Sequence, residues 1–203
     1  MTGYKIVNLK HVIDEFGEDR TKAILSEFSC PMNHDVEKFL KGKAIEFTKQ
    51  GLAGTSLVIA SYKGRPEIVG YFSLSNKTIT VNPNKLNRRM RDRLKRFGRY
   101  DDMLKVYCIS APLIGQLGKN YRDGLNKLIT GDELLQMACD RLSVIQMELG
   151  GRFVYLECED TRKLREFYER NHFFEFDRRD LDADETDLKG KYLVQLMRYL
   201  EGT

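Results

Sequence analysis

Seven stretches of the chain, bounded by turn residues, either alternate apolar with polar residues or form short apolar runs. The first pattern is typical of half-buried β-strands and the second of fully buried ones. Lys63, Gly64, Arg65 and Pro66, between the second and third stretches, indicate a hairpin. We predict strands at 4–9, 55–62, 67–75, 105–117, 152–159, 173–176 and 192–200, and expect 78–81 either to extend the third strand or to form a separate one.

Other segments repeat apolar residues every three or four positions, which predicts amphipathic helices that bury one face. Side chains that can cap a helix precede two of these segments, and glycines follow or interrupt several. We predict helices at 11–28 with a break near Gly17, at 34–51 after a cap by Asn33 or His34, at 84–98, at 130–149, and in a short segment containing Tyr168 after a cap by Asp160 or Thr161.

Strands and helices interleave along the whole chain, so we expect a mixed α/β (α+β) fold. The 203 residues, 41% hydrophobic and 32% charged, suit one globular domain over 1–203. No apolar run reaches the ~18 residues of a membrane span, and the first residues lack the apolar core of a signal peptide. The four cysteines show no CxxC spacing, and no histidine has a second ligand candidate nearby. This favours a cytoplasmic protein with reduced thiols and no metal site.

The segment 84–99 differs from the rest of the chain in charge. Its eight Lys or Arg residues and single acid, Asp92, give a net charge of +7, against +4 for the whole chain. Arginine suits phosphate because its planar fork binds two oxygens, so a polyanion such as RNA is one expected partner. The cations are Lys85, Arg88, Arg89, Arg91, Arg93, Lys95, Arg96 and Arg99, and the apolar face that would anchor this basic helical insertion is Leu86, Met90, Leu94 and Phe97, with Gly98 ending the helix.

Anchoring by this apolar face would leave the arginines directed outward. The alternative to RNA binding is a solvated insertion, since charge runs are usually solvated. Its charge would then be balanced by the acidic segment 177–187, which we expect to be a mobile loop. The balancing segment could come from the same subunit or from a second one, and in the latter case the protein would be a homodimer.

Residues 105–150 combine an apolar stretch, a polar loop and a strong helix. Pro112 interrupts the apolar stretch and predicts a bulged or bent strand. Thr130 and Glu133 form the capping-box pattern, which places the helix start at Thr130 to within a residue or two. The free N–H groups of such a first turn make a natural anion site. An ordinary β-loop-α unit without a ligand would show the same pattern.

Three separated segments resemble the GNAT superfamily of acyl-CoA-dependent N-acetyltransferases. They are LIGQLGKN (113–120), TGDELL (130–135) and EDTRKLREFYERNHFFEF (159–176), and the order of predicted elements is similar over nearly the whole chain. The segment FSCPMNHDVEKFL (28–40), followed by Ala44, is also similar to the toxin-like branch that acetylates aminoacyl-tRNA. The resemblance implies a central splayed β-sheet flanked by helices on both faces, with acetyl-CoA as co-substrate.

The resemblance also implies where acetyl-CoA would bind. Backbone groups of Leu117, Gly118 and Lys119 would pair with pantetheine as a strand would. The loop amides before the helix would hold the diphosphate. These loop residues are Asn126, Lys127, Leu128, Ile129, Thr130 and Gly131.

The loop departs from the family pattern in two ways. The family has Gln or Arg, two residues, Gly, one residue, then Gly or Ala, whereas this chain has the β-branched Ile129 at the first glycine position. Asp132 and Glu133 also add negative charge where a diphosphate would lie, which Lys119 and Lys127 could offset.

Tyr168 is the candidate catalytic residue. The resemblance places it where a phenol of pKa about 10 could protonate the leaving thiolate, although a tyrosine beside Phe167 also suits simple packing. Glu157 and Glu159 fit solvated or paired carboxylates, so the sequence names no general base.

The expected function is therefore acetyl transfer from acetyl-CoA to a primary amine by direct attack. The acceptor could be a small molecule, a protein or the amino group of an aminoacyl-tRNA. The alternative is a catalytically inactive, GNAT-like nucleic-acid-binding module, which the altered loop and the basic segment would favour.

Overall fold

The computed structural model describes residues 3–182 and 190–201, and the chain in it divides into two compact units. Unit 1 comprises Met1–Ser75 and Gly115–Ala138, and unit 2 comprises Asn76–Ile114 and Cys139–Thr203. One strand, β7, and one helix, α6, contribute residues to both units. A single domain over 1–203 stays a prediction.

Unit 1 contains most of the expected N-terminal elements. Gly17 separates two helices as predicted, and the side chain of Asn33 caps the next by accepting from the N–H of Val36. The elements are β1 (Lys5–Asn8), α1 (Leu9–Phe16), α2 (Glu18–Ser26), α3 (His34–Lys38), a π-helical turn (Phe39–Lys43), α4 (Ala44–Lys49), β2 (Gly54–Tyr62), β3 (Arg65–Ser75), the end of β7 (Leu113–Lys119), a 3-10 segment (Arg122–Lys127) and the start of α6 (Gly131–Leu149).

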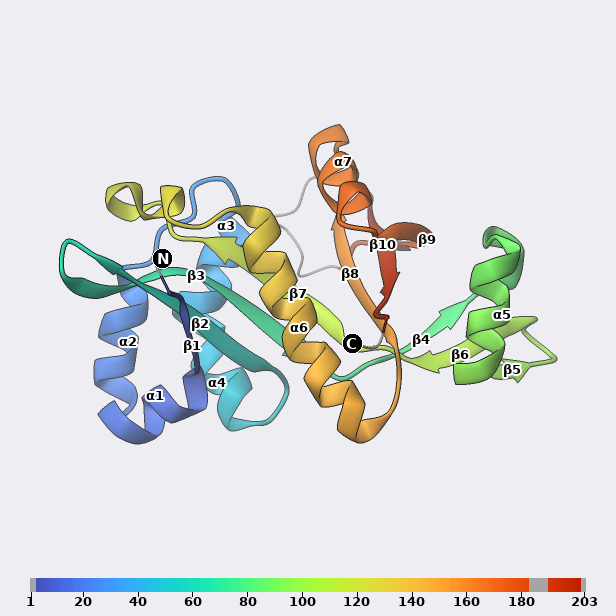
Figure 1. Ribbon diagram of the computed structural model, residues 1–203, viewed down its shortest axis with the longest axis horizontal. Helices are drawn as coiled ribbons and strands as arrows, with labels where there is room; N and C mark the ends of the chain where they lie inside the picture. Colours follow the sequence, from blue (N-terminus) through green and yellow to red (C-terminus); the bar gives the residue numbers. More distant parts are fainter. Residues whose placement is uncertain (1–2, 183–189, 202–203) are drawn as a thin grey trace. The chain divides into compact units, whose positions relative to one another are not determined.

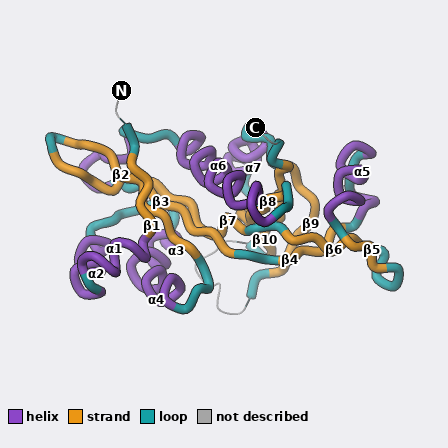
Figure 2. The backbone as a smooth tube through the Cα atoms, turned by 60° about the horizontal axis from the view of Figure 1, so that its bottom comes forward, coloured by secondary structure: helices purple, strands orange, loops and turns teal. Residues whose placement is uncertain are grey.

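Helices cover both faces of the unit 1 strands. On one face α1 to α4 surround a core that includes Leu9, Phe28, Leu40 and Tyr71, and Figures 1 and 2 show these helices together beside β1–β3. On the other face the start of α6 packs so closely that a Cβ on Gly70 would lie 3.2 Å from a Leu134 methyl.

Unit 2 holds the basic segment and the C-terminal strands. Its second core joins Leu86, Met90 and Leu94 to Phe153 and Met197, so the basic segment is anchored by its apolar side chains as predicted. The elements are β4 (Thr78–Val81), a 3-10 turn (Pro83–Lys85), α5 (Arg88–Phe97), β5 (Arg99–Asp101), β6 (Val106–Ser110), β8 (Phe153–Glu159), α7 (Arg162–Arg170), β9 (Phe174–Asp180), β10 (Tyr192–Tyr199), the start of β7 and the end of α6.

The strands form a seven-stranded sheet in the order β1-β2-β3-β7-β8-β10-β9 and a three-stranded sheet in the order β4-β6-β5. In the larger sheet β7 and β8 are parallel, with Leu113 opposite Tyr155, whereas β1–β2, β2–β3, β8–β10 and β9–β10 are antiparallel. The sheet is therefore mixed, and the α/β fold class with helices on both faces is confirmed.

The single bent strand predicted for 105–117 is wrong. Ala111 and Pro112 divide it into β6 and β7, which belong to different sheets. Proline has no N–H for a sheet ladder, and the backbone groups around it bind elsewhere: Ala111 N–H donates to Lys77 O and Pro112 O accepts from Tyr155 N–H. The chain therefore leaves one sheet and enters the other at this point.

Three smaller expectations also need correction. Helix α5 begins at Arg88 after an Asn87 cap, so Leu86 precedes it. Ile145 and Leu149 of α6 are 36% and 82% exposed, so the apolar face of this helix is buried only toward its N-terminus. The expected acidic loop 177–187 begins inside β9, since Asp177–Asp180 are paired with β10, and 183–189 lie outside the described residues.

Among the described residues, no helix is both long enough and apolar enough to cross a membrane.

Candidate functional site

Gly118, near the end of β7, is required by close packing. A Cβ at this position would lie 2.3 Å from Val36 Cγ1, so a side chain here would displace its neighbours, and it would also contact the Tyr71 ring at 3.5 Å. The backbone of β7 is thereby pressed against α3 and β3. Leu117 and Lys119 on either side are half-buried.

Asn120 anchors the chain as it leaves β7. Its side chain is 3% exposed, accepts from the N–H groups of Ser29 and Arg122, and donates to Ile68 O at 2.8 Å. Its own N–H donates to Val69 O at 2.9 Å. A single amide side chain therefore fixes the loop entrance to two other segments of unit 1, a role that the sequence did not reveal.

Lys119 lies inside the following loop. Its Nζ donates to Asn126 O at 2.9 Å and to Ile129 O at 3.1 Å. The carbonyl and N–H on the two sides of a trans peptide point in opposite directions, so the N–H of Lys127 is directed away from the Lys119 ammonium. The loop thus surrounds a positive charge with backbone carbonyls.

The capping box at the start of α6 is confirmed. Glu133 N–H donates to Thr130 Oγ1 at 3.1 Å, and Thr130 N–H donates to Glu133 Oε2 at 2.7 Å. These bonds lower the pKa of Glu133, with Lys119 contributing further through its charge. Glu133 therefore keeps its negative charge at neutral pH, and its carboxylate accepts hydrogen bonds from Thr130 and Tyr4.

The six loop amides proposed for the diphosphate are not equivalent. Thr130 N–H is used by Glu133, and Leu128 N–H donates to Leu125 O at 3.0 Å. Lys127 N–H lies in the last turn of the 3-10 segment, where amides bond to the carbonyl three residues earlier. Gly131 N–H is the better-placed donor, because the first turn of a helix has no internal acceptors for its amides. The structure brings Lys119, Asn126, Ile129 and Thr130 together around one turn of chain.

Tyr168 lies in α7 of unit 2 and is 9% exposed. The rings of Phe167 and Phe173 pack against it with centroids at 4.9 and 6.0 Å. Burial, with a smaller contribution from Cys158, raises the pKa of the Tyr168 phenol well above its usual range. The phenol therefore stays protonated at neutral pH, as a general acid must, although the same shift reduces the driving force for giving up its proton.

Glu157 is held by two partners. Its Oε2 accepts from Arg179 Nη2 at 2.9 Å and its Oε1 accepts from Gln195 Nε2 at 2.8 Å. The reading of Glu157 as a paired carboxylate is confirmed, and it is poorly suited to act as a general base.

A polar group beside Leu117 was missed by the sequence reasoning. Gln116 Nε2 donates to Asp35 Oδ2 at 2.9 Å, and the buried Tyr71 hydroxyl donates to Val36 O at 2.6 Å. Burial raises the pKa of Tyr71 well above its usual range, with Asp35 adding to the shift. A polar glutamine inside an apolar strand was the only sequence signal for this group.

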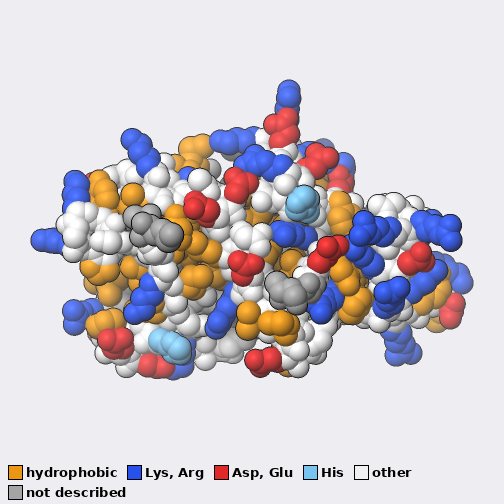
Figure 3. Space-filling model, in the orientation of Figure 1, with side chains coloured by type: hydrophobic (Ala, Val, Ile, Leu, Met, Phe, Trp, Pro, Cys, Tyr) orange, Lys and Arg blue, Asp and Glu red, His pale blue; other side chains and the backbone are white. Residues whose placement is uncertain are grey.

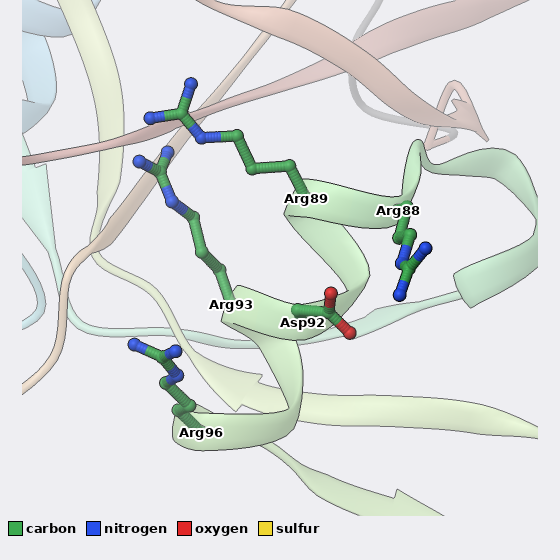
Figure 4. Close-up of a pocket in the computed structure, with 5 residues that line it drawn as sticks. All are labelled: Arg88, Arg89, Asp92, Arg93 and Arg96. Carbon is green, nitrogen blue, oxygen red and sulfur yellow. The ribbon is translucent and has the colours of Figure 1, made fainter.

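Arginines of α5 enclose a surface hollow of about 520 Å³ in unit 2. Figure 4 shows Arg89, Arg93 and Arg96 directed to one side of the helix, with Arg88 and Asp92 on another. Lys and Arg side chains also crowd this segment in Figure 3. The prediction that all the arginines point outward is wrong for Arg93, whose side chain is 21% exposed and lies over the Tyr199 ring at 4.0 Å.

Within the described residues, no three His, Cys, Asp or Glu side chains are grouped so as to hold a metal ion. The four cysteines are free thiols that form no disulfide. Burial raises the pKa of Cys139 to about 11 and that of Cys158 to about 12. Both thiols are therefore protonated and unreactive at neutral pH.

Comparison with solved structures identifies the fold. A bacterial toxin superposes with a TM-score of 0.63 at 14% identity, covering 98% of this chain and 92% of that chain. A mutant of KacT gives 0.61 at 13% identity, covering 96% and 94%. AtaT complexed with acetyl-methionyl-tRNAfMet gives 0.59 at 14% identity, covering 95% and 94%. The GNAT-like fold expected from the resemblance is thereby confirmed.

Other structures with this fold include a mutant of the AtaT toxin bound to the C-terminus of the antitoxin AtaR and acetyl-CoA, and a KacTA–DNA complex. No protein-family model matches the sequence, and no curated protein matches it either.

Proposed function

We propose that this protein transfers the acetyl group of acetyl-CoA to the amino group of an aminoacyl-tRNA. The observation that carries the proposal is the loop between β7 and α6. There the Lys119 ammonium donates to two carbonyls, the Glu133 carboxylate is bonded to Thr130, and Gly131 begins the first turn of α6. These features supply what an anion site needs, namely positive charge and oriented amides.

Pantetheine would pair with the backbone of Leu117, Gly118 and Lys119. The diphosphate would bind the loop of Asn126, Lys127, Leu128, Ile129, Thr130 and Gly131, chiefly through the amide of Gly131 at the start of α6. Ile129 need not be glycine in this arrangement, because its carbonyl turns inward to Lys119.

In the reaction, the acceptor amine attacks the thioester carbonyl, the carbon–sulfur bond breaks and coenzyme A leaves as a thiolate. Tyr168 is proposed to donate its phenolic proton to that sulfur. The proton lost by the amine passes to solvent or to a base, for which Glu157 is not proposed because Arg179 and Gln195 occupy it.

Aminoacyl-tRNA is the favoured acceptor for two reasons. AtaT, which has the same fold, is known in complex with acetyl-methionyl-tRNAfMet. The basic segment Lys85–Arg99 also offers this chain a surface for RNA phosphates, and only part of its charge is balanced internally, for example by the Lys85–Asp177 ion pair at 2.6 Å. A second subunit could balance the remainder, so a homodimer stays a prediction.

The test of cofactor binding is thermal unfolding with acetyl-CoA. At a concentration about 100 times the dissociation constant, ligand binding adds about 2.7 kcal/mol to the free energy of unfolding and should raise the midpoint clearly. The absence of a shift at millimolar acetyl-CoA would leave the second candidate, a catalytically inactive nucleic-acid-binding module, which the internally bonded amides of Leu128 and Thr130 favour.

Catalysis is tested with Tyr168→Phe, assayed by thiol release from acetyl-CoA in the presence of aminoacyl-tRNA. We expect turnover to fall by about 10²–10⁴-fold while acetyl-CoA affinity stays nearly unchanged. Phe167→Leu is the matched control, since it alters the same packing without removing a proton donor. Full turnover in Tyr168→Phe would assign this tyrosine to packing alone.

A further inference from the structure

The arginines of α5 do not all lie on one face of the helix. Arg89, Arg93 and Arg96 are spaced i, i+4 and i+7, so they share one face of the helix, whereas Arg91 lies about half a turn away. Figure 4 shows the three side chains extending to the same side as separate guanidinium groups. We call Arg89, Arg93 and Arg96 the arginine row.

The central member of the row is held in place from two sides. Arg93 stacks over the Tyr199 ring with its Cζ 4.0 Å from the centroid, and its Nη2 donates to Glu201 Oε1 at 2.8 Å. Phe97 and Phe153 pack edge-on around the same tyrosine. A guanidinium stacked in this way has lost much of its rotational freedom, so it loses less on binding a phosphate.

Glu201 serves the row as an internal counter-ion. The carboxylate oxygen that binds Arg93 also lies 3.7 Å from Arg89 Nη2. A carboxylate presents two oxygens to an arginine as a phosphate does. The Glu201 side chain is nevertheless 71% exposed and follows the last strand. Solvent therefore screens its ion pair with Arg93, and replacing the carboxylate by a phosphate costs little free energy.

We infer that the arginine row binds consecutive phosphates of an RNA backbone, and that Glu201 occupies the position of one phosphate until RNA displaces it. The inference rests on the proposed function for its ligand, and it adds the atoms that bind and the group that competes. Successive turns of the helix place Arg89 and Arg93 about 6 Å apart along its axis, a separation that lets each contact a different phosphate.

Charge supports RNA over an acidic protein segment as the occupant. The segment 84–99 has a net charge of +7 in a chain whose total is +4. Phe153 is buried and Tyr199 lies under Arg93, so the row offers its ligand chiefly guanidinium groups, with Phe97, which is 39% exposed, as the apolar side chain beside them. Backbone phosphate is recognised in this way without reading bases.

The experiment measures binding of labelled deacylated tRNA to the full chain at several salt concentrations. Glu201→Gln removes the competitor and should tighten binding about two- to five-fold, the range for an exposed ion pair. Glu166→Gln is the matched control, because it removes the same charge from α7, where Glu166 pairs with Arg162. Equal tightening by both variants would overturn the role of Glu201.

Two further variants test the row itself. Arg89→Gln combined with Arg96→Gln should weaken binding by at least ten-fold and flatten its salt dependence, since fewer counterions are released. Arg91→Gln on the opposite face should weaken it much less. Equal losses per arginine would overturn the row, as would competition by poly-glutamate as strong as that by unlabelled tRNA.

A separate measurement of acetyl-CoA binding distinguishes failure of the arginine row from failure of the proposed acetyl transfer. A chain that binds acetyl-CoA but shows no salt-dependent tRNA binding would overturn the arginine row and leave acetyl transfer to another amine. A chain that binds tRNA through the row but not acetyl-CoA would overturn the proposed reaction and retain the row.

Discussion

The loop before α6 and helix α5 both concentrate positive charge, but they use it in opposite ways. In the loop, Lys119 points inward and its ammonium is bonded to the carbonyls of Asn126 and Ile129. In α5, the Arg89 side chain is 77% exposed, and its Nη2 lies 3.7 Å from the carboxylate of the largely exposed Glu201, too far for a hydrogen bond. The positive charge of the loop therefore stabilises the loop's own conformation, whereas most of the positive charge of α5 remains accessible to a partner.

This difference predicts how each region should respond to change. A site built from backbone groups and one enclosed cation depends on packing, so it should be sensitive to shape and nearly insensitive to salt. A site built from exposed guanidinium groups should tolerate single substitutions but depend strongly on salt. The predictions below test the first half of this contrast, and the tRNA experiment tests the second.

The largest effect is expected from Gly118→Val. The new Cβ would lie 2.3 Å from Val36 Cγ1, so the buried Val36 side chain, β7 or α3 must shift, and we expect the free energy of unfolding to fall by about 1–3 kcal/mol. Urea denaturation measures this. Gly42→Ala is the control, since its Cβ would have no atom within 4 Å and its φ is not positive. An unchanged stability in Gly118→Val would mean that the end of β7 is not packed as described.

A smaller effect is expected from Lys119→Met. It leaves the carbonyls of Asn126 and Ile129 without their donor, which costs about 1–3 kcal/mol for each if the group stays buried and less if water replaces the ammonium. Acetyl-CoA affinity, measured by calorimetry, should fall by about ten-fold because the loop loses its shape and charge.

Lys127→Met removes the same charge from the exposed surface of the loop and is the control for Lys119→Met. S-acetylpantetheine, which has no diphosphate, provides a second control ligand and should bind both variants alike. Equal losses of acetyl-CoA affinity in the two variants would remove the contrast between enclosed and exposed charge.

The smallest effect is expected from Glu133→Gln, which weakens the capping box. A lost cap costs about 1 kcal/mol. The pKa of Glu133 lies below its usual range because Thr130 bonds the carboxylate, so its stabilisation is present above the usual pKa and is lost as pH falls through the lowered one.

The variant should therefore lose less stability than the parent protein between neutral pH and the acid range. Thermal unfolding at a series of pH values measures this difference, with Glu148→Gln at the other end of α6 controlling for the removal of one negative charge. A parallel pH response in Glu133→Gln and the parent would contradict the capping role.

Local features were predicted well from the sequence. The hairpin of β2 and β3, the Asn33 cap, the break at Gly17 and the capping box of Thr130 and Glu133 all appear as expected. Each depends on residues within a few positions of one another, so the chain specifies it without distant partners. The prediction that Met90 and Leu94 lie on the buried face of α5 was also correct, because helical periodicity is local.

Part of the candidate site could be predicted and part could not. The segments 113–120 and 130–135 pointed to a β-loop-α site, and the structure places Lys119 at its centre. The direction of the Lys119 side chain and the use of the Leu128 and Thr130 amides depend on the folded path of the loop, which its altered glycine pattern did not specify. The role of Asn120 in anchoring the start of this loop could not be predicted either, since its partners Ser29 and Ile68 are distant in sequence.

The sequence by itself determined the order of the elements, their caps and the concentration of charge in 84–99, because periodicity, turn chemistry and composition act over short distances. Only the tertiary structure decided that Pro112 separates two sheets, and that Arg93 stacks on Tyr199 and pairs with Glu201 across 108 positions of chain. Such contacts arise when distant segments are brought together by burial of the shared core, and no local pattern records which surface residues then meet.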